Sequence, residues 1–120
     1  MDLNDFFTAY VECALWSSTD ESDESGGEPM DANYTIDDIA AESLEDMRKD
    51  CQDFIEGNAA DLADMDSEQA GHDFWLTRNG HGAGFWDRGL GELGERLTKA
   101  SEPYGDSHLY VGDDGKIHVG

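Results

Sequence analysis

The chain has 120 residues, enough for one domain, and its 29 Asp and Glu against 7 Lys and Arg give a formal net charge of -22. Such a charge repels nucleic-acid phosphates and anionic membrane surfaces, so direct binding to either is not expected. No apolar run approaches a membrane span, the N-terminus lacks the basic region of a signal peptide, and two cysteines are too few for a disulfide-rich secreted scaffold. We therefore expect a soluble, cytoplasmic protein.

The acidic residues concentrate in the first part of a single expected domain, 1–120. Residues 1–70 contain 21 acids and two bases, whereas residues 71–120 contain eight acids and five bases. Eleven of the 14 glycines also lie in the second part. The composition therefore predicts an acidic helical part at 1–70 and a hairpin–helix–hairpin part at 71–120.

The first predicted helix can be capped by Asn4, and its apolar residues recur at helical spacing from Phe6 to Leu15. Residues 17–34 have almost no apolar content and combine Ser, Gly, Pro and acids, so they predict a flexible acidic loop. This loop fails the EF-hand calcium pattern, because Ala32 stands where the motif needs Glu.

A long second helix is predicted from Ile36 to Ile55, with Thr35 as its N-cap and Gly57 at its end. Its apolar residues recur every three or four positions and form one face. Six outer acids lie on the other side and span about 27 Å at the rise of an α-helix. They are Asp38, Glu42, Glu45, Asp46, Asp53 and Glu56.

The spacing of these outer acids is of the same order as that of DNA phosphates. One charge every roughly 4–5 Å compares with one phosphate per about 3.4 Å of axis on one DNA strand. A protein that binds phosphates could therefore bind this helix. The alternative is a solvated face that only keeps the protein soluble, although the net charge is larger than solubility requires.

The remaining segments predict two hairpins around a short helix. Aromatic runs at 72–79 and 84–88 flank a glycine-rich turn, and leucines lie on one side of 90–100. Residues 108–119 contain an Asp-Gly turn between apolar runs, which is a strong hairpin signal. With a short helical piece at 59–66, the order ααββαββ predicts an α+β domain in which two N-terminal helices pack on a small antiparallel sheet.

The first predicted hairpin carries a possible contact cluster. Pairing Arg78 with Phe85 would place Trp75, Trp86 and Arg88 on one face. If this face is exposed, it resembles an interface hot spot, where Trp and Arg are enriched. Packing of Arg88 on a Trp inside the fold is the alternative.

The same segment leaves a ligand site open. The glycine-rich run 80–84 does not match a phosphate-binding P-loop, and a hairpin turn explains it. His72, His81 and Asp87 are residue types that suit zinc or general-base chemistry, but their spacing matches no metal signature. We expect no catalytic residue, metal or cofactor, and we expect both cysteines to be buried thiols.

The segment GHDFWLTRNGHGAGFWDRG (71–89), with the residues that follow it to 120, resembles a family of small acidic proteins from bacteriophages and mobile elements. This family has no assigned activity, so the resemblance implies a viral or plasmid setting and no catalytic residues. In that setting, small and very acidic proteins are often DNA mimics that block host nucleases, restriction enzymes, CRISPR effectors or DNA-repair enzymes.

The sequence therefore predicts a DNA-mimic inhibitor of a host DNA-binding defence or repair protein with a basic groove. It would act as a monomer or a homodimer, in the host cytoplasm, through the six outer acids and through Trp75, Trp86 and Arg88. Two alternatives stay open. One is a small-ligand-binding domain or small enzyme centred on residues 71–89, and the other is a general acidic interaction module.

Overall fold

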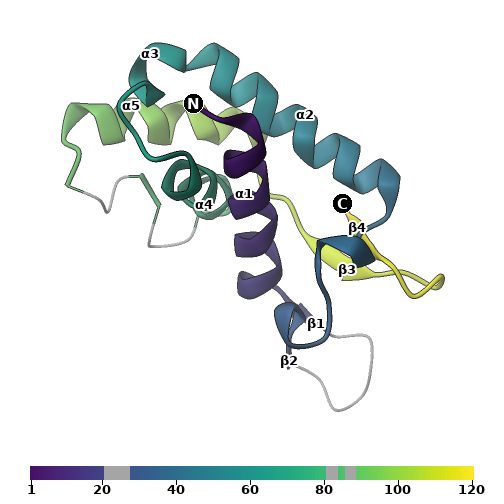
Figure 1. Cartoon of the computed structure of the whole chain (residues 1–120). Helices are drawn as coiled ribbons and strands as arrows, with labels where there is room; N and C mark the ends of the chain where they lie inside the picture. The colour runs from purple at the N-terminus through teal and green to yellow at the C-terminus, as the bar shows by residue number, and fades with distance from the viewer. Residues whose placement is uncertain (21–27, 81–83, 86–88) are drawn as a thin grey trace.

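The computed structural model describes residues 1–20, 28–80, 84–85 and 89–120, which are mostly helical (Figure 1). The α-helices among them are α1 (Leu3–Ser17), α2 (Ala41–Gly57), α3 (Ala59–Leu62), α4 (Ser67–Arg78) and α5 (Glu92–Ser101). Short 3-10 helices are η1 (Met30–Ala32), η2 (Ile36–Asp38) and η4 (Glu102–Tyr104). The described strands form two antiparallel pairs, β1 (Thr19–Asp20) with β2 (Glu28–Pro29) and β3 (Leu109–Val111) with β4 (Ile117–Val119).

The predicted α+β fold with the order ααββαββ is wrong. Residues 72–79, predicted as the first strand of a hairpin, lie almost entirely in α4. This helix packs against α1 and α5, and α1 also contacts α2 (Figure 1). The described chain is therefore a helical assembly with a small C-terminal hairpin, and its helices do not cover a central sheet.

The sequence does not reveal α4 because this helix is buried on nearly every side. From Ala70 to Arg78, every residue except His72 is buried. A helix surrounded by its neighbours has no polar face, so its apolar residues show no helical period. A start signal is nevertheless present, since the Asp66 carboxylate accepts a hydrogen bond of 3.0 Å from the backbone N–H of Gln69. Asp followed three residues later by Gln is a capping signature that could have indicated this helix.

Helices α1 and α4 cross closely at Gly71. A side chain at this position would collide with the backbone carbonyl of Phe6, so the crossing requires glycine. The core beside this crossing is aromatic. The rings of Phe54 and Phe74 stack with centroids 4.1 Å apart, and the Phe6 ring lies 6.0 Å from Phe74. Helices from the acidic part and from the nearly balanced part thus share one core.

The predicted second helix is interrupted near its start. Thr35 is an N-cap as predicted, but it caps η2, where the Asp38 carboxylate accepts a hydrogen bond of 2.7 Å from the Thr35 N–H. Ile39 is extended and forms an isolated parallel bridge with Ile117 of β4. Regular α-helix then begins at Ala41. Through the Ile39–Ile117 bridge, the C-terminal hairpin contacts the extended segment that precedes α2.

Several local predictions are confirmed. The short piece after Gly57 contains α3, the helix at 90–100 corresponds to α5, and the Asp-Gly hairpin is formed by β3 and β4.

Two details near the N-terminus differ from the prediction. The N-cap of α1 is Asp2 rather than Asn4, because Asp2 Oδ1 accepts a hydrogen bond of 3.1 Å from the Asp5 N–H. The loop predicted at 17–34 contains short strands and a buried Met30, while its residues 21–27 lie outside the described part.

Candidate functional site

The outward side of α2 presents five of the six predicted outer acids. All five are exposed, and we call them the α2 acidic face: Glu42, Glu45, Asp46, Asp53 and Glu56. Met47, Cys51 and Phe54 on the opposite side of the helix are buried in the core. Lys49 is exposed among the five acids, so this face carries five negative charges and one positive charge.

Contacts on the flanks of α2 hold this face in place. Arg48 Nη2 donates a hydrogen bond of 3.0 Å to Asn4 Oδ1 on α1, and its guanidinium lies 5.4 Å from the centre of the Phe7 ring. Near the start of α2, Ser43 Oγ accepts a hydrogen bond of 3.0 Å from the backbone N–H of Val119. The five carboxylates therefore project from a helix that is tied to α1 and to β4.

The sixth predicted acid, Asp38, does not belong to this face. It lies in η2, ahead of the extended residue that separates η2 from α2, and it is half-buried. Its carboxylate already accepts the Thr35 N–H in the capping box. Asp38 therefore stabilises the local chain, and we leave it out of the candidate surface.

The predicted exposed cluster of Trp75, Trp86 and Arg88 is wrong at Trp75, which is buried. Its side chain is 2% exposed, its Nε1–H donates a hydrogen bond of 2.8 Å to Ser17 Oγ, and its ring packs edge-on against Tyr10. Trp75 is therefore a core residue, and its predicted place on a hairpin face is wrong because the segment is helical. The other candidates from this segment lie outside the described residues: His81, Trp86, Asp87 and Arg88.

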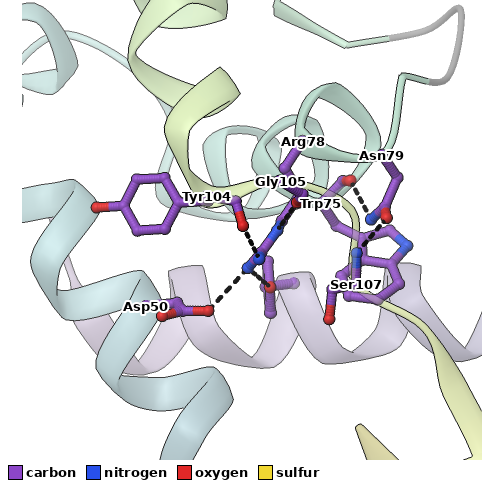
Figure 2. A network of polar contacts seen from close by, with 8 residues as sticks. Asp50, Trp75, Arg78, Asn79, Tyr104, Gly105 and Ser107 are labelled. Atoms are coloured by element: carbon purple, nitrogen blue, oxygen red, sulfur yellow. Dashed lines mark hydrogen bonds and ion pairs between the residues drawn. The ribbon is translucent and has the colours of Figure 1, made fainter. Parts of the chain in front are cut away.

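A buried cation at the end of α4 is the main polar feature that the sequence did not indicate. The Arg78 side chain is 6% exposed, and Figure 2 shows it reaching from α4 toward Asp50 of α2. Its Nη1 donates to Asp50 Oδ2 at 2.8 Å and to Tyr10 Oη at 2.9 Å. Its Nε and Nη2 donate to the backbone carbonyls of Gly105 and Tyr104. We call this set of contacts the Arg78 cluster.

The Arg78 cluster joins four parts of the chain. Burial alone would lower the pKa of the guanidinium, but Tyr10 and Asp50 raise it above its usual range, so Arg78 stays charged. Beside it, Asn79 Oδ1 accepts a hydrogen bond of 2.7 Å from the Ser107 N–H (Figure 2). All these partners are groups of the same chain, so the cluster anchors the segment after α5 to the helices.

A surface groove runs along the exposed side of α1. Its volume is about 830 Å³, and we call it the α1 groove. Glu12 and Trp16 of α1 line it, the beginning of α4 forms one wall, and residues 31–36 form the other. Of the predicted trio, His72 lines this groove, whereas His81 and Asp87 lie outside the described residues.

His72 lies between the groove and the core. Its ring centroid is 6.1 Å from that of Trp16, and its Nδ1 is 3.8 Å from Asp73 Oδ1. Among the described residues, no group forms a hydrogen bond with this buried Nδ1. The imidazole therefore packs against the Trp16 ring at the edge of the groove.

Both cysteines are buried, as predicted, and both are unsuited to nucleophilic chemistry. Burial raises the pKa of the Cys13 thiol to about 12, and the negative charge of Asp73 adds to the rise. Burial, together with the charge of Asp50, also raises the pKa of Cys51 far above its usual range. Each sulfur stays protonated at neutral pH, whereas a reactive cysteine must be a thiolate.

Within the described residues, no group of three or more His, Cys, Asp or Glu side chains is arranged to hold a metal ion. No helix in the same part of the chain combines the length and the apolar character needed to cross a membrane. Comparison with known proteins finds no matching family model, no matching curated protein and no matching solved structure.

Proposed function

We propose that this chain binds the basic DNA-binding groove of a host defence or repair protein in place of DNA, and thereby blocks it. The observation that supports the proposal is the α2 acidic face. From Glu42 to Glu56, five exposed carboxylates follow one side of a single helix. These positions span about 21 Å of helix, along which one DNA strand carries about six phosphates.

The charge of the whole chain favours the same function. With a formal net charge of -22, the protein attracts basic surfaces over a longer range than contacts alone allow. Electrostatic steering of this kind raises association rates and makes binding sensitive to salt. The proposed inhibition requires no chemical step. The resemblance of residues 71–120 to small acidic phage proteins supplies the proposed setting, the cytoplasm of an infected cell.

The proposal is tested by competition with DNA. A fluorescent DNA duplex is bound to each of a panel of proteins with basic grooves: a restriction enzyme, a CRISPR effector, a nuclease and a DNA-repair glycosylase. The chain is then titrated in at low and at moderate salt, and fluorescence anisotropy measures the DNA released. We expect displacement from at least one panel member, with an affinity that falls steeply as salt rises.

Two variants of equal charge separate a defined surface from general acidity. The first reverses three members of the α2 acidic face, Asp46→Lys, Asp53→Lys and Glu56→Lys. The second reverses three exposed acids elsewhere, Asp64→Lys, Glu102→Lys and Asp113→Lys. Each set changes the formal net charge from -22 to -16. We expect the first set to abolish displacement and the second to weaken it slightly, whereas equal loss would reduce the chain to a general acidic interaction module.

A further inference from the structure

The α1 groove has the shape of a site for an extended chain. It follows the exposed side of α1 from Thr8 to Trp16, a distance of about 12 Å at the rise of an α-helix. A strand advances about 3.3 Å per residue, so the groove accommodates three or four extended residues. Its floor includes Ala9 and Cys13, and Tyr34 and Ile36 add apolar surface from the facing wall.

The lining of this groove is negatively charged. Four exposed carboxylates line it, contributed by Glu12 of α1, Asp31 of η1, and Asp66 and Glu68 at the start of α4. Among the described residues that line it, none is Lys or Arg. An extended segment that enters the groove therefore meets negative charge on three sides, and a cationic segment is favoured.

An exposed aromatic residue gives the groove a second binding element. The side chain of Trp16 is 59% exposed although its neighbours on α1 include core residues, whereas Trp75 is buried. Trp16 lies one helical turn after Glu12, so its ring and that carboxylate project from the same side of α1. A flat indole beside carboxylates suits guanidinium, which stacks on aromatic rings and pairs with carboxylates in a fork.

We propose that the α1 groove binds an arginine-bearing extended peptide segment of a protein partner. One guanidinium stacks on Trp16 and pairs with Glu12, and further cationic groups of the segment face Glu68 and Asp66. The apolar wall formed by Tyr34 and Ile36 contacts the peptide between these charges. This groove shares no residue with the α2 acidic face, so the inference does not depend on the proposed function.

The probe is a fluorescein-labelled nine-residue peptide of alternating Gly and Arg, and its binding is measured by fluorescence anisotropy. Trp16→Ala is expected to weaken binding about fivefold, the range of one cation–aromatic contact. Tyr110→Ala is the matched control, because Tyr110 is 52% exposed on β3, outside the groove. We expect this control to bind as the unchanged protein does.

A second pair of variants tests the carboxylates, and the two variants have the same net charge. Glu12→Gln with Glu68→Gln removes two charges from the groove, and Glu45→Gln with Glu56→Gln removes two from the α2 acidic face. We expect the groove pair to weaken binding several times more than the α2 pair. Equal weakening by the two pairs would overturn the proposal, since it would mean attraction to net charge alone.

NMR identifies where the peptide binds. The indole N–H signal of Trp16 is assigned by its loss in Trp16→Phe, and we expect it to shift on addition of the peptide, while that of Trp75 stays in place. An unmoved Trp16 signal would contradict the proposal. Free arginine amide is the last probe. If it binds as tightly as the peptide, the groove is a site for small cations and the proposal of an extended segment is overturned.

Discussion

Helix α2 carries aspartates in two environments, and their difference shows how this chain uses its charge. Asp50 is on the inner flank of the helix, where it accepts a hydrogen bond of 2.8 Å from the buried guanidinium of Arg78. Asp46 and Asp53, four residues before and three after it, are exposed on the α2 acidic face. The inner carboxylate is part of the fold, and the outer ones are available to a partner.

In this chain, the number of acids is less informative than their position relative to a few cations. Arg78 has partners on α1, on α2 and in the segment 104–105, so its charge joins distant parts of the chain. Lys49 is exposed among the five carboxylates of the α2 acidic face. Changes in the Arg78 cluster should therefore affect folding, and changes in the α2 acidic face should affect binding.

The largest effect on stability is expected for Arg78→Met. This change leaves Asp50, the Tyr10 hydroxyl and two backbone carbonyls without their common donor, and should cost about 3–5 kcal/mol of unfolding free energy. Urea denaturation measures the loss. The control is Arg96→Met, which removes an exposed ion pair with Asp61 and should have a much smaller effect. A similar loss in both variants would show that Arg78 has no special role.

Gly71→Ala should cost the next largest amount, about 1–3 kcal/mol, because the added methyl meets the rigid backbone of Phe6 where α1 crosses α4. Gly57→Ala provides the matched control. A methyl group there has nothing within 4 Å, and alanine favours the helical end of α2. Thermal unfolding of the two variants should therefore shift in opposite directions, and a tolerated Gly71→Ala would contradict the close helix crossing.

Alkaline pH should weaken the fold through buried neutral groups. Burial raises the pKa of Cys13 to about 12 from an ordinary value of 9.0, and the pKa of Tyr10 is also raised by burial. Because the pKa values are raised in the folded state, the unfolded chain loses these protons at lower pH than the folded chain does. The contribution of the two groups to the free energy of unfolding is therefore complete below about pH 9 and declines as the pH rises further. Each group contributes up to about 1.4 kcal/mol per pH unit in this range. Urea denaturation from pH 8 to 11 measures the decline.

The Cys13→Ala variant separates the thiol's part of this effect. It should be less stable at pH 8, because it leaves a small cavity, yet lose less stability between pH 9 and 11 than the unchanged chain. Thiol alkylation of the native protein gives an independent reading of the same group. Rapid alkylation at pH 9 would contradict the raised pKa of Cys13.

The smallest effect on stability is expected on the α2 acidic face. Asp46→Asn with Asp53→Asn should change the unfolding free energy by no more than about 0.5 kcal/mol, because both side chains are exposed and outside the core contacts. The same double variant should displace DNA from a basic-groove protein less well. Strong destabilisation would place these aspartates in the fold, against the comparison above.

The sequence predicts those elements that have one buried apolar side and one exposed polar side, or that contain a clear turn. The regular course of α2, the helix α5 and the β3–β4 hairpin follow from apolar residues alternating with exposed acids or from turn residues. The sequence predicts a strand where α4 lies because the residues of this helix are buried all round, and the capping pair Asp66 and Gln69 is the usable signal of the helix. The Arg78 cluster joins residues more than 25 positions apart, and the α1 groove is lined by three separate segments of the chain, so local patterns could not indicate them.

Amide NMR of the chain with a basic-groove protein from which it displaces DNA tests directly whether the α2 acidic face is the binding surface. Backbone signals from Glu42 to Glu56 should shift on binding, while the Nε–H signal of Arg78 keeps its position. Shifts confined to other parts of the chain, with unmoved α2 signals, would contradict the assignment of the α2 acidic face as the surface that binds in place of DNA.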